Sequence, residues 1–233
     1  MLSCDHLVIL EVITLPKQTF FNLDVKKRKT IESFALEEFS THSFNEASVN
    51  TIIKKSKISK GSLYQYFDDK VDLYLYLIEI SAQVKLEFLK NCEPNTKFDD
   101  FFEGFTQLMI KGSEFDLCNP LHSKLLYHAL NGPLVDKSLE KMKALSGQYL
   151  LQLLKTAVKR QQLREDVNLE LMVFFLNTLA TEFAKYAAAK AGVDYFGDIY
   201  HPQNINRIKK LDLPMIVEEL MKLIKDGLAP VNN

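Results

Sequence analysis

A short polar stretch near the start of the chain carries residue types suited to binding nucleic acid. Taken as a helix with about 100° between successive residues, residues 60–67 divide into two sides. The apolar side consists of Leu63, Tyr66 and Phe67. The polar side consists of Gly61, Ser62, Tyr64 and Gln65, with Lys60 on the border. Hydroxyl, amide and ammonium groups without a carboxylate favour contacts with phosphates and base edges, because a polyanion repels carboxylates.

Three predicted helices position this polar side. The first runs from about Asp24, its N-cap, to Ser40, with apolar residues at three- and four-residue spacing. The second covers about 47–55, with Asn45 or Ser48 as its cap. After a break at 56–58, Ser59 caps the third, which covers about 60–67. Two short helices behind a longer one form the helix-turn-helix pattern.

Charge is distributed unevenly along the chain. Residues 25–65 contain eight Lys or Arg and four Glu, which gives +4. Because the whole chain has a net charge of −1, the remainder carries −5. A basic N-terminal region followed by an acidic remainder is expected of a nucleic-acid-binding protein that has a second function. The basic residues from Lys26 to Lys29 lie at a predicted helix N-terminus, where the helix dipole disfavours cations. They either bind a partner elsewhere or form a charge run exposed to solvent.

The sequence from Ala47 to Leu73 resembles the TetR/AcrR family of bacterial transcriptional regulators. The family signature is an A-x-x-S-x-G-[ST]-[LF]-Y-x-[YH]-F-x-x-K-x-x-L type string. The residues that match in register are Ser59, Gly61, Ser62, Leu63, Tyr64, Tyr66, Phe67, Lys70 and Leu73. The strong resemblance covers about residues 24–75. Two departures are Lys57 and Ser43, where the family usually has glycine.

The resemblance implies an all-α fold and a division of the chain. It gives an N-terminal extension (1–23), a three-helix helix-turn-helix DNA-binding domain (24–70) and a C-terminal helical domain for effector binding and dimerisation (71–233). It also implies that Lys60 and Tyr64 contact phosphates, that Gly61 lets the backbone approach DNA, and that Ser62 and Gln65 contact base edges. Further implied DNA-binding residues are Lys29, Ser48, Thr51, Ser59, Tyr66 and Lys70. Tyr66 is alternatively a core residue, and Ser48 alternatively a simple cap.

The remainder of the chain is expected to form further helices, with a polar connection over 192–211. Residues 171–176 are apolar all round, which predicts burial on more than one side. Five residues of this part either line an apolar effector pocket with a polar group or belong to the ordinary core. They are Phe105, Met109, Tyr127, His128 and Phe174. The family implies a dimer interface on the last two long helices, with intrachain core as the alternative: Leu176, Leu179, Ala180, Phe183, Ala187, Ile216, Leu220 and Leu223.

Other classes of protein find little support in the sequence. It contains no nucleophile elbow, P-loop, dinucleotide fingerprint or zinc-protease motif, so we do not expect an enzyme. No CxxC occurs, and His122 and His128 do not have metal-pair spacing, so neither metal nor cofactor is expected. No apolar stretch is long enough to cross a membrane, and residues 1–15 make a poor signal peptide.

The sequence therefore predicts a cytoplasmic, homodimeric transcriptional regulator, of the repressor kind. Its expected partners are double-stranded operator DNA, a second copy of the chain and a small-molecule effector that releases it from the DNA. The alternative is a helical small-molecule-binding or scaffold protein that no longer binds DNA.

Overall fold

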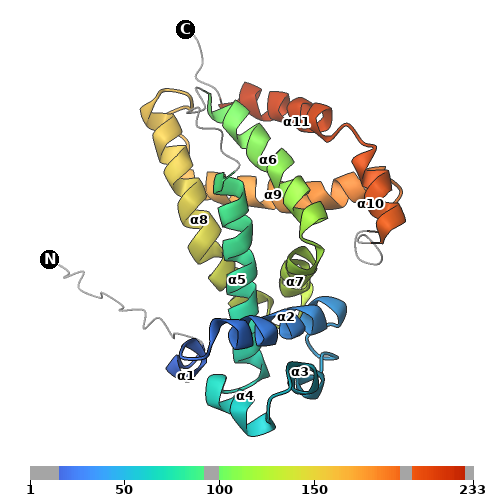
Figure 1. Cartoon of the computed structure of the whole chain (residues 1–233). Helices are drawn as coiled ribbons and strands as arrows, with labels where there is room; N and C mark the ends of the chain where they lie inside the picture. Colours follow the sequence, from blue (N-terminus) through green and yellow to red (C-terminus); the bar gives the residue numbers. More distant parts are fainter. Residues whose placement is uncertain (1–15, 92–99, 195–200, 229–233) are drawn as a thin grey trace, which may run out of the picture.

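The computed structural model describes residues 16–91, 100–194 and 201–228, and every regular element within them is a helix (Figure 1). In chain order the helices are α1 (Gln18–Phe21), α2 (Val25–Thr41), α3 (Val49–Ser56), α4 (Lys60–Tyr66), α5 (Lys70–Asn91), α6 (Phe101–Cys118), α7 (Pro120–Asn131), α8 (Val135–Lys159), α9 (Leu169–Lys190), α10 (Pro202–Lys209) and α11 (Leu213–Leu228). The predicted all-α class is thus confirmed. We call α1–α4 with the first turns of α5 the head, and α6–α11 with the rest of α5 the body.

Side-chain caps at residues that the sequence indicated begin three helices of the head, α2, α3 and α4. Asp24 Oδ1 accepts from the backbone N–H of Lys26 at 2.9 Å, which begins α2. Ser48, and not Asn45, caps α3, and Ser59 caps α4. In the body, Asn168 caps α9 through the N–H of Leu171 at 3.0 Å. Each cap satisfies a backbone donor that the first helical turn leaves free.

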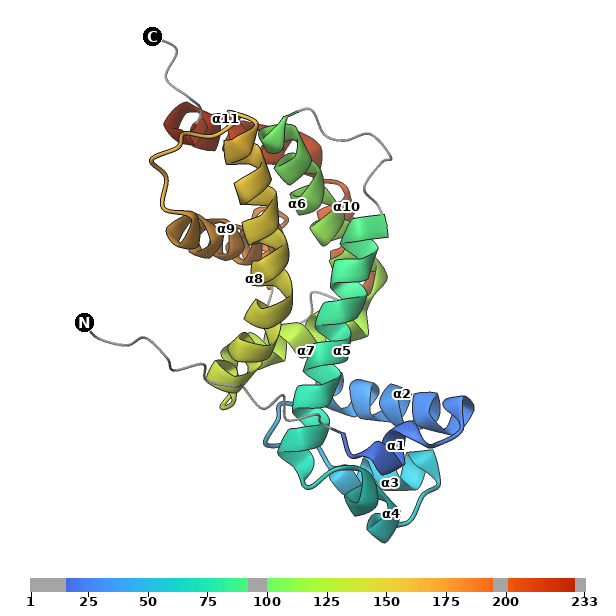
Figure 2. The same cartoon turned by 90° about the vertical axis from the view of Figure 1, so that its left-hand side faces the viewer.

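Two large apolar cores and a small third cluster around Ala188, Val193 and Ile208 hold the described residues together, and α5 runs between the two large cores (Figure 2). The lower core joins the head to the first turns of α5 and to α7, with Phe39, Leu73 and Leu125 fully or almost fully buried. The upper core joins α6, α8, α9 and α11, with Leu154 and Leu176 fully buried. Because α5 packs against α7, α8 and α6 as well as α2, a change in the packing of the body can change the direction of the head.

Expectations about two segments outside the predicted helices need correction. The predicted extension 1–23 includes α1, whose Phe20 is fully buried in the lower core; residues 1–15 lie outside the described residues. A four-residue helix is too short to show a 3.6-residue apolar pattern, so α1 could not be predicted from periodicity. Likewise, the predicted connection 192–211 contains α10, a polar helix that starts with Pro202.

Two buried tyrosines of α5 differ in the environment of their hydroxyl groups. Tyr74 packs against the rings of both Phe39 and Phe44, at 5.1 and 5.0 Å, and its buried hydroxyl has no hydrogen-bond partner among the described residues. Burial raises the pKa of Tyr74 to about 12. The Tyr76 hydroxyl donates to Glu32 Oε1 at 2.7 Å. Burial, followed by this carboxylate, raises the pKa of Tyr76 above its usual range.

We predict opposite effects for removal of these two hydroxyl groups. Tyr74→Phe should raise the free energy of unfolding by about 1 kcal/mol, because an unpaired buried hydroxyl is lost. Tyr76→Phe should lower it by about 2 kcal/mol, because a hydrogen bond to a charged group is lost. Urea denaturation at pH 7 measures both. A similar loss of stability in the two variants would mean that the Tyr74 hydroxyl has a partner in solution.

Candidate nucleic-acid interface

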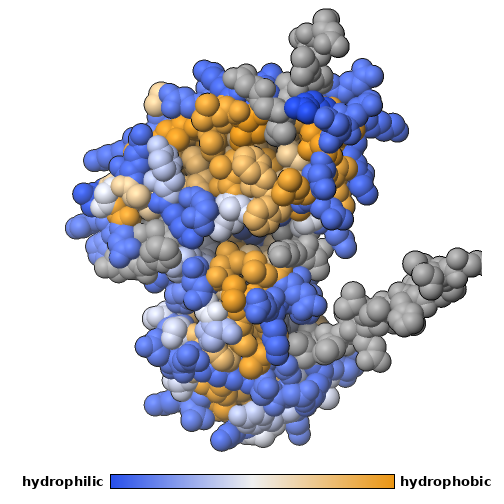
Figure 3. All heavy atoms as spheres, turned by 180° about the vertical axis from the view of Figure 1, so that it is seen from behind, coloured by the Kyte–Doolittle hydropathy of each residue, from blue (hydrophilic) through white to orange (hydrophobic). Residues whose placement is uncertain are grey.

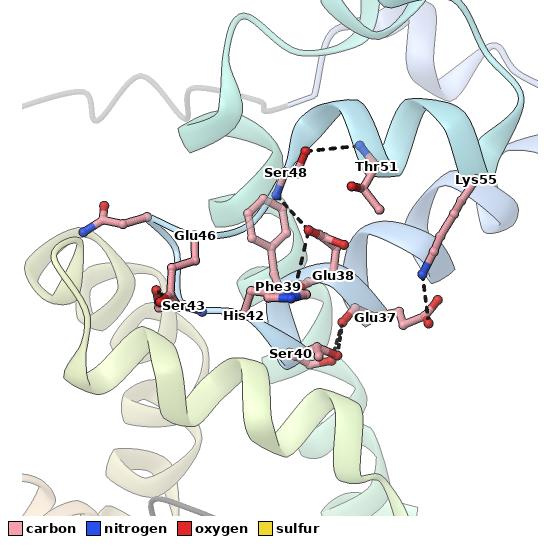
Figure 4. A network of polar contacts seen from close by, with 12 residues as sticks. Glu37, Glu38, Phe39, Ser40, His42, Ser43, Glu46, Ser48, Thr51 and Lys55 are labelled. Carbon is pink, nitrogen blue, oxygen red and sulfur yellow. Dashed lines mark hydrogen bonds and ion pairs between the residues drawn. The ribbon is translucent and has the colours of Figure 1, made fainter.

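Helix α3 is tied to α2 near both of its ends (Figure 4). At its start, the backbone N–H of Ser48 donates to Glu38 Oε1 at 2.8 Å, and Ser48 Oγ accepts from the N–H of Thr51 at 3.3 Å. Near its end, Lys55 Nζ lies 3.0 Å from Glu37 Oε1. The sequence analysis did not single out Glu38, which is buried. The available signal was its place on the apolar side of α2, three residues after Ala35, where a carboxylate needs a partner.

The turn between α3 and α4 places Lys57 in the left-handed backbone region, with φ 54° and ψ 41°. The N–H of Ile58 donates to the carbonyl of Ile53, and that of Lys57 to the carbonyl of Lys54, both at 3.3 Å. This pair of bonds is a Schellman motif, which usually has glycine at the left-handed position. A side chain there costs roughly 1 kcal/mol, so Lys57 is tolerated at some expense of stability.

Helix α4 presents the polar side that the sequence predicts. Leu63, Tyr66 and Phe67 are buried, whereas Lys60, Gly61, Tyr64 and Gln65 are exposed. Ser59 Oγ accepts from the N–H of Ser62 at 3.0 Å and lies 2.8 Å from the Ser62 hydroxyl, so Ser59 serves chiefly as the cap. Neither α3 nor α4 contains a carboxylate, while Lys54, Lys57 and Lys60 are all exposed. The exposed surface of these two helices is therefore basic and rich in donors.

Packing within the chain does not require glycine at position 61. A Cβ atom there would have one neighbour within 4 Å, Ser59 Oγ, at an ordinary 3.8 Å. Glycine is unfavourable within a helix relative to alanine, so its presence here is not explained by the fold of the described residues.

Four predicted DNA-binding residues lie elsewhere or have other contacts. Tyr66 is a core residue, which corrects its assignment as a DNA contact; its ring lies 5.7 Å from that of Phe20. The Ser48 hydroxyl is used as the α3 cap. Lys70 donates to the carbonyl of Asn45 at 3.4 Å, and burial lowers its pKa. Lys29 lines a surface hollow on α2, all of whose lining residues lie between 24 and 34.

The five predicted pocket residues do not come together. Phe105 and Met109 are buried in the upper core. His128 lies at the joint between head and body, where its Nδ1 is 3.1 Å from the carbonyl oxygen of Phe39, and Tyr127 is its neighbour on α7. Phe174 is 64% exposed, which corrects its assignment to an interior pocket.

Residues 171–176 are likewise not buried on all sides. Met172 and Leu176 face the upper core, whereas Leu171, Phe174 and Phe175 are exposed. Figure 3 shows apolar residues gathered over the body on the side where α9 lies. A helix that is apolar all round needs a cover for its outer side, and no partner chain is part of this structure.

The predicted dimer residues fall into three groups by exposure. Four are buried within the chain itself, which corrects their assignment: Leu176, Phe183, Ala187 and Ile216. Leu179 and Leu220 are half-buried against the upper core, whereas Ala180 and Leu223 are exposed. We call the exposed apolar residues of α9 and α11 the outer face; its large members are Leu171, Phe174, Phe175, Tyr186, Met215 and Leu223.

Metal binding and membrane insertion find no support in the described parts of the chain. Within residues 16–91, 100–194 and 201–228, no three His, Cys, Asp or Glu side chains are grouped so that they could hold a metal ion. None of the helices in these ranges is both long and apolar enough to span a bilayer.

Comparison with known proteins agrees with this geometry. Residues 33–77 match the family model of bacterial regulatory proteins of the tetR family, and residues 99–228 match that of the tetracyclin repressor-like C-terminal domain. A TetR family transcriptional regulator from Chloroflexus aurantiacus is 27% identical, with a TM-score of 0.67 over 93% of this chain and 99% of that one. The regulator FadR from Bacillus subtilis, solved with stearoyl-CoA, is 14% identical, with a TM-score of 0.60 over 85% of this chain and 98% of that one. A search of curated protein sequences found no match.

We predict that Lys57→Gly stabilises the protein by up to about 1 kcal/mol, because glycine adopts the left-handed conformation without steric cost. The control is Lys54→Gly, which removes the same charge three residues earlier, within α3, but should destabilise by about 0.5–1 kcal/mol. Thermal and urea unfolding measure both. Equal destabilisation in the two variants would show that the left-handed geometry of residue 57 does not persist in solution.

Proposed function

This chain belongs to the TetR family of bacterial regulatory proteins, and from that premise we propose that it represses transcription as a homodimer that a small-molecule effector releases from operator DNA. The observation that carries the proposal is the exposed side of α4, with its ammonium, hydroxyl and amide groups and no carboxylate. One such short helix offers few base contacts, so two half-sites and two heads are needed for useful affinity. We place this activity in the cytoplasm, where bacterial DNA lies.

The roles of single residues follow from their exposure. Lys60 and Tyr64 are proposed to contact phosphates, and Gln65 and Ser62 to contact base edges. Thr51, half-buried on α3, is proposed to contact the DNA backbone. Gly61 is proposed to allow close approach of the sugar-phosphate backbone. This role would explain a glycine that packing within the chain does not require.

The outer face supports the homodimer. Leu171, Phe174 and Phe175 are between 45% and 64% exposed, and Leu223 is 75% exposed. An exposed apolar surface of this kind usually marks an interface. In a dimer with two-fold symmetry the same surface covers its own copy. The alternating burial along α9 fits this role, because one side is already fixed in the upper core.

The effector is proposed to act on the contacts that join body and head. Helix α5 follows α4 directly and continues into the body, and α7 packs on both α2 and α5. Between the two cores lies a half-buried polar cluster, in which Lys85 Nζ and Ser123 Oγ each lie 2.8 Å from Asp116 Oδ1. An effector that binds two arrangements of these helices with different affinity shifts the population between them.

DNA binding is tested first by gel shift, with DNA from upstream of the protein's own gene and a scrambled duplex of the same length. We expect selective, salt-sensitive binding to the upstream DNA. Equal and weak binding of both duplexes by intact dimer would favour the alternative of a helical ligand-binding or scaffold protein.

We predict that Gly61→Ala weakens operator binding about tenfold, the factor for loss of one good contact, without loss of stability. The stability should stay unchanged or rise by about 0.5 kcal/mol, because alanine is the better helix former. The control is Gly112→Ala on α6, where an added Cβ has no neighbour within 4 Å and binding should be unchanged. Unchanged operator affinity in Gly61→Ala would mean that this side of α4 does not contact the DNA.

For the dimer, we predict that Phe174→Glu shifts the equilibrium to monomer and raises the dissociation constant at least about tenfold, because a carboxylate would be buried in an apolar interface. Leu121→Glu is the control, since Leu121 is 41% exposed but lies on α7, away from the outer face. Analytical ultracentrifugation measures both. A Phe174→Glu dimer as tight as the wild type would assign dimerisation to another surface.

A further inference from the structure

The last turn of α4 is bonded to a segment that lies far away in sequence. The backbone N–H of Lys17 donates to the carbonyl of Tyr66 at 2.9 Å, and Lys17 Nζ donates to the carbonyl of Tyr64 at 3.2 Å. The hydroxyl of Thr19 donates to the carbonyl between them, that of Gln65. Three consecutive carbonyl groups, which a helix C-terminus leaves without intrahelical donors, thus accept from residues 17–19.

An apolar anchor fixes this segment to the same end of α4. Phe20 is fully buried, with its ring 4.9 Å from that of Phe67 and 5.5 Å from that of Tyr76. Lys17 also forms an ion pair with Asp68, in the link between α4 and α5. Figure 2 shows α1 beside α2 and above the α3–α4 pair. We call residues 17–20 the α4 clamp.

Helix α4 needs such an external support. It has seven residues, and isolated helices shorter than about 12 residues are marginal in water. Its C-terminal neighbour Phe67 has extended backbone and not the left-handed glycine that often closes a helix. Thr19 itself is exposed, so its hydroxyl contributes a directed hydrogen bond rather than buried apolar area.

We propose that the α4 clamp positions the recognition surface: its donors hold the last turn of α4 so that Tyr64 and Gln65 point at the DNA. This inference rests on the proposed function. Two of the three clamped carbonyls belong to these same two residues. Base-edge contacts depend on accurate placement, whereas lysines attract phosphates from many positions. Loss of the clamp should therefore reduce selective binding more than non-selective binding.

The test compares three single variants of the full-length protein. Thr19→Val keeps the shape of the side chain but removes the donor, and Thr19→Ser restores the donor. The control is Thr30→Val, in which the same change removes a hydroxyl that donates at 2.8 Å to the carbonyl of Lys26 within α2. Amide hydrogen exchange of residues 60–66 is measured without DNA, and affinity for upstream and scrambled DNA is measured over a range of salt concentrations.

In Thr19→Val we expect exchange in residues 60–66 to be about threefold to tenfold faster, the factor given by one lost hydrogen bond of ordinary strength. We expect the ratio of upstream to scrambled affinity to fall at least about threefold, with an unchanged salt slope because the phosphate contacts remain. Thr19→Ser and Thr30→Val should resemble the wild type in both measurements. A merely destabilised head would lower both affinities equally.

Two results would overturn the clamp. One is wild-type exchange in residues 60–66 of Thr19→Val. The other is faster exchange with an unchanged affinity ratio, which would make Thr19 structural but not positioning. If the wild-type protein fails to select upstream DNA, the proposed function fails, and the exchange measurement alone then decides whether residues 17–20 hold α4.

Discussion

A helix of seven residues cannot fix its own direction, and the recognition surface proposed for this protein lies on such a helix. The orientation of α4 depends on bonds at both ends. Ser59 caps its start, and the Schellman turn at Lys57 sets its angle to α3. Donors from Lys17 and Thr19 satisfy the carbonyls of its last turn. The polar residues on the outer side of α4 keep their direction only while these hydrogen bonds persist.

The same constraint explains the buried carboxylate of Glu38. Burial of a charge is costly unless the charge is hydrogen-bonded, and Glu38 accepts from the N–H of Ser48, with His42 Nδ1 3.6 Å away. Through this contact α2 fixes the beginning of α3, and α3 in turn carries the turn to α4. The head is thus a chain of directed polar contacts around an apolar core, in which each short helix takes its position from a neighbour.

In the body, part of the apolar surface packs in the upper core and part of it is exposed. Helix α9 places Met172 and Leu176 in the upper core while it leaves Phe174 and Phe175 exposed. Helix α5 links the upper core to the lower one. In the proposed function, a dimer contact at the outer face and an effector-dependent change between the cores would both act on α4 through α5, which follows α4 in the chain.

The sequence by itself determined the local part of this protein. Residue types at short spacing gave the caps at Asp24 and Ser59, the division of α4 into an apolar and a polar side, and the family, because each depends on neighbours within one or two helical turns. For α3 they left Asn45 and Ser48 as alternatives, and the structure selects Ser48. The tertiary structure decided the rest: the partner of Glu38, the burial of Phe20, the contacts of Thr19, and which apolar residues of α9 face outward. Glu38 and Ser48 are 10 residues apart and Thr19 and Gln65 are 46 apart, and neither pair lies within one helix. Helical periodicity shows that a face is apolar without showing what covers it.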